Sequence, residues 1–95
     1  MTGVADVLNG AADLIERDGW CQGTFRDGGA RCASRAIGDA AENTKNPHGP
    51  DWSDAAHICL RKLTGHWFVS GWNDKPGRTK AEVVAALRAA AERAL

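Results

Sequence analysis

The first part of the chain carries a helical hydrophobic pattern. Between Val4 and Asp18, apolar residues recur every three or four positions and polar residues fill the intervening ones. Thr2 is placed to cap the start, and Gly19 to end the helix in a left-handed conformation. We therefore predict an amphipathic helix over residues 4–18. Its apolar face consists of Val4, Val7, Leu8, Ala11, Leu14 and Ile15.

The pattern then changes to one typical of a hairpin. The segment Trp20–Cys32 combines aromatic and β-branched residues with an Asp-Gly-Gly turn signal, centred on Asp27–Gly28 or Gly28–Gly29. These two registers place Cys32 opposite Gly23 or Phe25. Neither places it opposite Cys21, so a bond between the two thiols is not predicted.

Small apolar residues at helical spacing predict a second helix from Cys32 to Asn43, with a possible ion pair between Arg35 and Asp39. The segment Asn43–Asp51 contains two prolines and a glycine, which predicts a loop. The apolar face of the second helix consists of Ala33, Ala36, Ile37, Ala40 and Ala41.

A third helix is predicted from a cap at Asp51 or Ser53 to about Leu63. Ile58 points nearly opposite its apolar face, so it either contacts another element or is exposed. Gly65 is expected to interrupt the helix. The apolar face consists of Ala56, Cys59, Leu60 and Leu63.

The segment His66–Trp72 leaves two alternatives open, a short helix or an irregular aromatic segment. The spacing of its aromatic residues from Leu63 favours helical geometry. We expect Trp67 and Trp72 to close the core, with Trp20 plugging one end, because tryptophan buries a large area.

A turn and a last helix complete the pattern. Turn-forming residues occupy 73–77, and Thr79 and Glu82 form a Thr-x-x-Glu capping box at the helix start. The predicted buried face consists of Val83, Val84, Leu87, Ala90, Ala91, Ala94 and Leu95. The prediction is a mainly α fold, a compact bundle of about four helices with a short β-hairpin after the first, in one domain spanning residues 1–95.

Composition narrows the function classes. Twelve basic residues balance twelve acidic ones, which disfavours a DNA-coating or polybasic membrane-binding protein. No apolar run approaches the roughly 20 residues that span a bilayer, and the N-terminal residues lack a signal-peptide pattern. Three cysteines, an odd number, argue against a disulfide framework. We expect a cytoplasmic protein with reduced thiols.

Three sequence blocks carry a resemblance to a known family. They are Trp-Cys-Gln-Gly at 20–23, Cys-Ala at 32–33, and Trp-Asn-Asp-x-Pro-Gly-Arg-Thr-x-x-Glu-Val at 72–83. The chain resembles, from about Leu8 to Ala91, a family of small proteins of unknown function from actinobacteria and their phages. Members commonly carry a longer insert between the first block and the cysteine. The resemblance implies an actinobacterial or actinophage origin and no catalytic role.

Cys32 is the candidate for a thiol-dependent enzyme. It lies where a helix is predicted to begin, and a helix N-terminus lowers the pKa of a thiol. His57 or His66 would supply the base. No oxyanion hole or orienting third group is legible, and burial in the core is the simpler interpretation.

A zinc site is the second chemical hypothesis. Cys21, Cys32, Cys59 and His57 could be combined as ligands. Structural zinc sites usually show ligand pairs of the type Cys-x2–4-Cys, with two to four residues between the ligands, and the chain lacks such a pair. We therefore predict no metal and no cofactor.

Basic residues around the aromatic segment suggest a single-stranded nucleic-acid binder as another alternative. The alternative interpretation is a solvated helix rim and a turn. No known nucleic-acid-binding motif is legible, which disfavours this function. The basic residues are Arg61, Lys62, Lys75, Arg78 and Lys80.

Trp52 lies in a polar loop just before the third helix. It either packs at the helix entry or stays exposed beside His48 and Pro50 as a binding hot spot. The function predicted from the sequence is a non-enzymatic protein–protein interaction module, such as a phage modulator of a host protein, or a homodimer. The predicted partner-binding residues are Trp52, His48, Ile58, Arg61 and Lys62.

Overall fold

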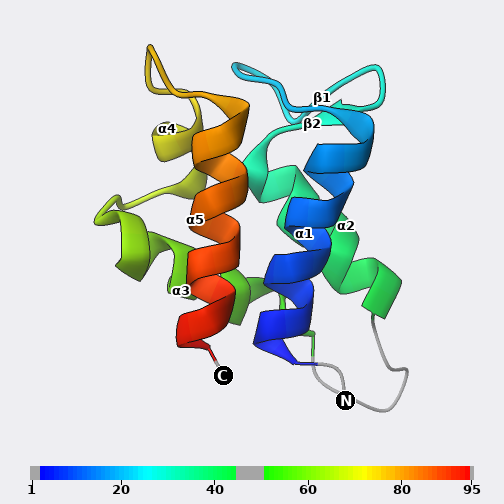
Figure 1. Cartoon of the computed structure of the whole chain (residues 1–95), viewed down its shortest axis with the longest axis vertical. Helices are drawn as coiled ribbons and strands as arrows, with labels where there is room; N and C mark the ends of the chain where they lie inside the picture. Colours follow the sequence, from blue (N-terminus) through cyan, green and yellow to red (C-terminus); the bar gives the residue numbers. More distant parts are fainter. Residues whose placement is uncertain (1–2, 45–50, 95) are drawn as a thin grey trace.

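Five helices and one antiparallel hairpin make up the part of the chain that the structure, a computed structural model, describes: residues 3–44 and 51–94 (Figure 1). This confirms the mainly helical fold with a short hairpin after the first helix. The additional helix is α4, a single turn. The elements are α1 (Val4–Asp18), β1 (Arg26–Asp27), β2 (Ala30–Arg31), α2 (Ala33–Thr44), α3 (Ser53–Thr64), α4 (Val69–Asn73) and α5 (Lys80–Arg93).

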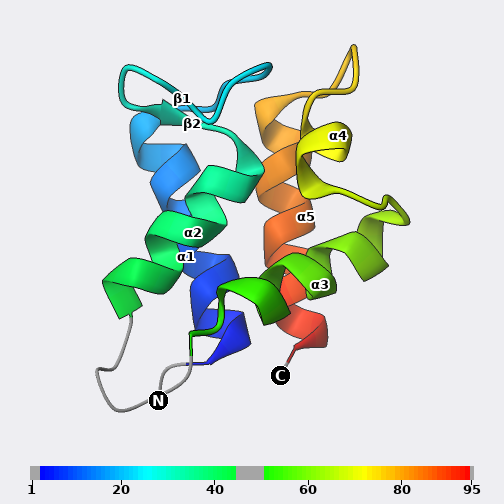
Figure 2. The same cartoon turned by 180° about the vertical axis from the view of Figure 1, so that it is seen from behind.

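Helices α1 and α5 run antiparallel, side by side, through the middle of the molecule (Figures 1 and 2). Seen from behind, α2 crosses α1, and α3 lies across the lower part of α5 (Figure 2). Buried residues from all five helices form one hydrophobic cluster. At the rim, Arg88 of α5 bonds Asp13 at 2.6 Å and Glu16 at 2.9 Å on α1.

The C-terminal end of α1 and the start of α5 follow the sequence prediction, whereas the N-cap of α1 is Gly3, without a side-chain cap, and not Thr2. Gly19 adopts a φ of 103° and donates its N–H to the carbonyl of Ile15, which ends α1. At the start of α5, the Thr79 side chain accepts from the backbone of Glu82, whose carboxylate accepts from the backbone of Thr79. The predicted capping box is confirmed. Thr2 and Leu95 lie outside the described residues.

The hairpin pairs Arg26 with Arg31 and Asp27 with Ala30, around a turn at residues 28–29. The backbone N–H of Cys32 donates to the carbonyl of Phe25, the second of the two predicted registers. A cross-strand bond between the cysteines is not formed.

Asn73 is a fully buried polar residue that sequence analysis assigned to a turn. Its Oδ1 accepts from the indole N–H of Trp20 at 2.6 Å and from the backbone N–H of Ala33 at 2.9 Å. Its Nδ2 donates to the carbonyl of Cys21 at 3.0 Å and to Asp74 Oδ1 at 2.9 Å. One side chain thus ties the end of α4 to the entry of the hairpin segment and to the start of α2.

The two C-terminal tryptophans behave differently. Trp72 is 5% exposed and belongs to the core, as predicted. Trp67 is 80% exposed, so the prediction that it closes the core is wrong. Helix α3 ends because Gly65 adopts a left-handed φ of 75°, and Phe68 is extended before α4 begins. The helical spacing therefore does not continue to Trp67, whose side chain stays outside.

Candidate binding surface

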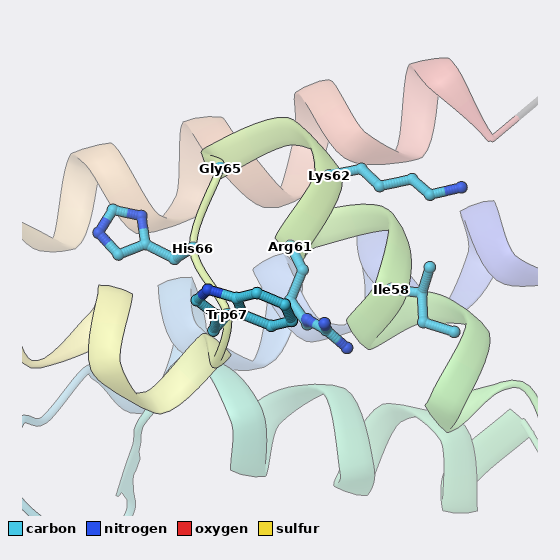
Figure 3. A pocket seen from close by; sticks show the side chains of 6 residues that line it. All are labelled: Ile58, Arg61, Lys62, Gly65, His66 and Trp67. Atoms are coloured by element: carbon cyan, nitrogen blue, oxygen red, sulfur yellow. The ribbon is translucent and has the colours of Figure 1, made fainter.

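A shallow hollow of about 490 Å³ lies beside the C-terminal half of α3. It is lined by Ile58, Arg61, Lys62, Gly65, His66 and Trp67, and we call it the α3 hollow. Figure 3 shows Ile58, Arg61 and Lys62 projecting from the helix, with His66 and Trp67 in the connection that follows. Three of the five partner-binding residues predicted from the sequence therefore lie together. They do so because positions i, i+3 and i+4 share one face of a helix.

The α3 hollow is cationic. Arg61, Lys62 and His66 contribute to its lining, and none of its six residues is acidic. Six of the chain's eight arginines form ion pairs, whereas Arg61 forms none with any residue that the structure describes. Its Nε is buried and has no hydrogen-bond partner within that same part of the chain.

Large apolar side chains are exposed at the same place. Trp67 is 80% exposed and Ile58 44%, and both line the α3 hollow. Phe68, next in the chain, is 72% exposed. The sequence pattern did not indicate that Trp67 and Phe68 are surface residues. Gly65 could have indicated it, because it ends α3 before these two residues and so removes them from the helical pattern.

The remaining predicted binding residues lie elsewhere or are not described. Trp52 is half-buried, packs against the hydrophobic core and does not line the α3 hollow. Its backbone carbonyl accepts the Ala56 N–H at 2.9 Å, and its place before α3 fits the helix-entry alternative. His48 and Pro50, in the predicted loop, lie outside the described residues, so their part of the prediction stays untested.

Cys32 is buried at the start of α2. It is 2% exposed, although it borders a second hollow of about 320 Å³. Burial raises the pKa of its thiol, against the smaller opposing effect of backbone N–H groups of Arg35 and Ser34. The Arg35 N–H donates to Cys32 Sγ at 3.3 Å, so the cysteine serves as a helix cap. A buried thiol with a raised pKa is poorly suited to attack a substrate at neutral pH.

The histidines considered as partners of Cys32 have other contacts. His57 Nδ1 lies 2.8 Å from the Ser53 carbonyl, and its Nε2 lies 2.9 Å from Ser34 Oγ. With the proton on Nδ1, the ring donates to the carbonyl and accepts from the Ser34 hydroxyl. This arrangement resembles that of a serine nucleophile and its base.

Two of the first N–H groups of α2 already have acceptors near Ser34. That of Ala33 donates to Asn73 Oδ1 at 2.9 Å and that of Arg35 to Cys32 Sγ at 3.3 Å, so neither is free to stabilise an oxyanion. The Ser34–His57 contact joins α2 to α3.

The four side chains considered for zinc do not assemble. Within residues 3–44 and 51–94, no three His, Cys, Asp or Glu side chains lie close enough to hold a metal ion. Cys59 packs against the core from α3, and Cys21 Sγ points toward the carbonyls of Thr24 and Phe25. Burial also raises the pKa of the Cys21 thiol.

The basic residues once grouped around the tryptophans separate into two places. Arg61 and Lys62 line the α3 hollow. Arg78 instead lies over the ring of the buried Trp72, 4.5 Å from its centroid, and bonds Glu82 at 3.1 Å. Arg61 and Lys62 on one side and Arg78 on the other therefore do not share one aromatic platform.

Comparison with known proteins places the chain in a family. The sequence profile of a family of unknown function, DUF6197, matches residues 1–93. The chain belongs to this family. The resemblance drawn from the sequence blocks is thus correct at the level of a family without a known function. Comparisons with curated proteins and with solved structures give no match. Within the described residues, no helix has both the length and the apolar character needed to cross a membrane.

Proposed function

We propose that this DUF6197 protein is a non-enzymatic protein-interaction module that binds its partner through the α3 hollow. The observation that carries the proposal is the 80% exposure of Trp67 beside the 44% exposure of Ile58. Covering exposed apolar side chains with a partner removes them from water, which favours binding. Tryptophan is also enriched among binding hot spots. The flanking Arg61 and Lys62 supply the polar rim that such interfaces carry.

The setting of this interaction follows from the resemblance to actinobacterial and actinophage proteins. We propose a cytoplasmic role in which the chain modulates a host or phage protein. Self-association is the alternative. It puts two identical cationic hollows close together if the symmetric contact is made at this face, which is unfavourable.

Affinity capture with paired variants tests the proposal. Lysate of an actinobacterium is passed over the wild-type protein, Trp67→Ala and Phe25→Ala. Phe25 is a matched control because it is also an exposed aromatic, at 61%, but belongs to the hairpin segment. We expect Trp67→Ala to lose the proteins that the wild type retains, and Phe25→Ala to keep them.

Retention of the same proteins by Trp67→Ala contradicts the proposal. A Trp52→Ala variant, run alongside, tests the surface first predicted from the sequence. Loss with Trp52→Ala but not with Trp67→Ala moves the binding site to the start of α3. Light scattering of the purified chain checks the self-association alternative, which predicts a dimer.

Binding of single-stranded nucleic acid is a second candidate, favoured by the exposed indole of Trp67 among Arg61, Lys62 and His66. Zero net charge and the engagement of Arg78 with Trp72 weigh against it. A mobility shift of an oligothymidine strand that weakens with salt supports this candidate. Absence of a shift at low salt rejects it.

A further inference from the structure

Arg61 has no ion pair with any residue that the structure describes, and this gives the α3 hollow a definite chemical preference. We propose that it binds a peptide segment in which an Asp or Glu lies beside an aliphatic or aromatic residue. The carboxylate pairs with Arg61, and the apolar side chain packs on Ile58 and Trp67. This inference rests on the proposed function and adds the chemistry of the partner.

Arg61 is the first reason. The arginines that hold the fold together are met by acids: Arg31 by Asp18 and Asp39, each at 2.7 Å, and Arg88 by Asp13. Arg61 is only partly exposed, its Nε is buried without a partner among the described residues, and no acid lines its hollow. A buried polar group without a partner is costly, and a carboxylate matches the fork of a guanidinium. A ligand carboxylate in the hollow would give the guanidinium of Arg61 the acidic partner that the described residues do not supply.

The helix dipole offers a simpler explanation for the position of Arg61 and Lys62. Both lie in the last turn of α3, where basic side chains interact favourably with the helix dipole. That interaction accounts for the charges alone. It does not account for Trp67 and Ile58, which face solvent in the same hollow. A ligand with one acid and one apolar side chain accounts for both.

The charge of the α3 hollow disfavours two other occupants, a second copy of the chain and a nucleic acid. A second copy placed symmetrically on this face brings Arg61 and Lys62 of both chains together, so the charges repel. A nucleic acid needs several cations along its backbone, whereas this hollow has Arg61, Lys62 and a histidine. A short acidic and apolar segment fits both the charge and the volume of about 490 Å³.

Selection from a random 12-residue peptide library displayed on phage tests the inference. The targets are the wild-type protein, Arg61→Gln, Trp67→Ala and Arg93→Gln. Arg93 is the matched control, since it is exposed in the last turn of α5 and also has no ion pair with a described residue. We expect peptides with an acid beside an apolar residue to be enriched on the wild type and on Arg93→Gln. Neither Arg61→Gln nor Trp67→Ala should enrich them.

Titration of an enriched peptide, followed by calorimetry, gives the magnitude. Arg61→Gln should weaken binding about tenfold or more, as expected for loss of a charge-assisted hydrogen bond, and Arg93→Gln less than about twofold. Replacing the acid of the peptide by its amide should cost the same, and the two changes together should be less than additive. If Arg61→Gln does not fold, the peptide amide and the salt dependence of wild-type binding provide the same test.

The outcomes separate this inference from the proposed function. Enriched peptides that depend on Trp67 but lack acids overturn the inference and leave the protein-binding proposal intact. If no enriched peptide depends on Trp67, both are contradicted for short peptides. Tight binding of an oligothymidine strand at the same hollow, lost with Arg61→Gln, overturns the choice of a peptide.

Discussion

The indole N–H of Trp20 donates a 2.6 Å hydrogen bond to Oδ1 of Asn73, which lies 53 positions later in the chain. The same oxygen accepts the backbone N–H of Ala33, and Nδ2 of Asn73 donates to the carbonyl of Cys21. Asn73 thus satisfies polar groups from two other elements, in full burial.

Replacing Asn73 with Ala should lower the free energy of unfolding by about 3 kcal/mol, because it leaves several buried polar groups without partners. Asn43→Ala, at an exposed position of α2, removes the same side-chain atoms and should change stability by less than about 0.5 kcal/mol. Urea denaturation at pH 7 measures both. A loss below about 1 kcal/mol for Asn73→Ala would show that the bonds are dispensable.

Asp39 makes stability depend on pH in the acid range. Burial raises the pKa of its carboxyl, but hydrogen bonds from Arg31 and Arg26 outweigh it and hold the pKa below the usual value. A carboxyl with a lowered folded-state pKa stabilises the fold above its unfolded pKa of about 3.9. That contribution is lost as the pH falls toward the folded-state pKa.

We therefore expect Asp39→Asn to destabilise the protein by about 1 kcal/mol at pH 7, and the difference from wild type to shrink below about pH 4. Denaturant melts from pH 7 to 2 measure this. Glu42→Gln is the control, an exposed acid on the same helix without an ion pair among described residues. A constant difference across the pH range argues against the ion pairs as its cause.

The same substitution should lower stability much more at Trp72 than at Trp67. Trp72→Phe removes buried area and the stacking of Arg78, and should cost about 2 kcal/mol. Trp67→Phe changes an exposed side chain and should stay within about 0.5 kcal/mol. Thermal unfolding of the two variants measures this. Equal losses would mean that Trp67 is packed in solution.

The cationic lining of the α3 hollow should be visible in fluorescence quenching. Iodide should quench the emission of Trp67 more strongly than caesium does, because Arg61 and Lys62 attract the anion. The difference should fall with added salt and vanish in Trp67→Phe. Equal quenching by the two ions in the wild type would contradict a net positive surface.

Cys32 should be slow to react in the folded protein. Because burial both covers the thiol and raises its pKa, iodoacetamide at pH 7.5 should alkylate it at least tenfold more slowly than free cysteine. Unfolding in urea should remove the protection. Peptide mass spectrometry follows Cys32, Cys21 and Cys59 separately. A faster reaction at Cys32 than in free cysteine would revive the thiol-enzyme hypothesis.

Much of the fold was predictable because it depends on local signals. The spacing in α1, the glycine at its end and the Thr79–Glu82 capping box act within a few residues, and the structure confirms each. The hairpin adopts the second of the two registers that its turn signal allowed, and Asp39 bonds Arg35 at 3.2 Å as its helical spacing predicted.

The rest depended on contacts between distant segments. Asn73 stands in a sequence typical of turns, and only the approach of Trp20 and Ala33 makes it a buried residue. For the candidate site, Ile58, Arg61 and Lys62 could be grouped from helical spacing alone. The exposure of Trp67 could not be predicted from that spacing, because it depends on the left-handed Gly65 and the extended Phe68.

Asn73 also bears on which part of the segment 20–33 can change in length. All its bonds to the segment 20–33 are made at the two ends of that segment, at Trp20, Cys21, Gln22 and Ala33. The turn at residues 28–29 makes none of these bonds, so its length can change without removing any of them. Residues can therefore be inserted at this turn while the bonds of Asn73 are kept.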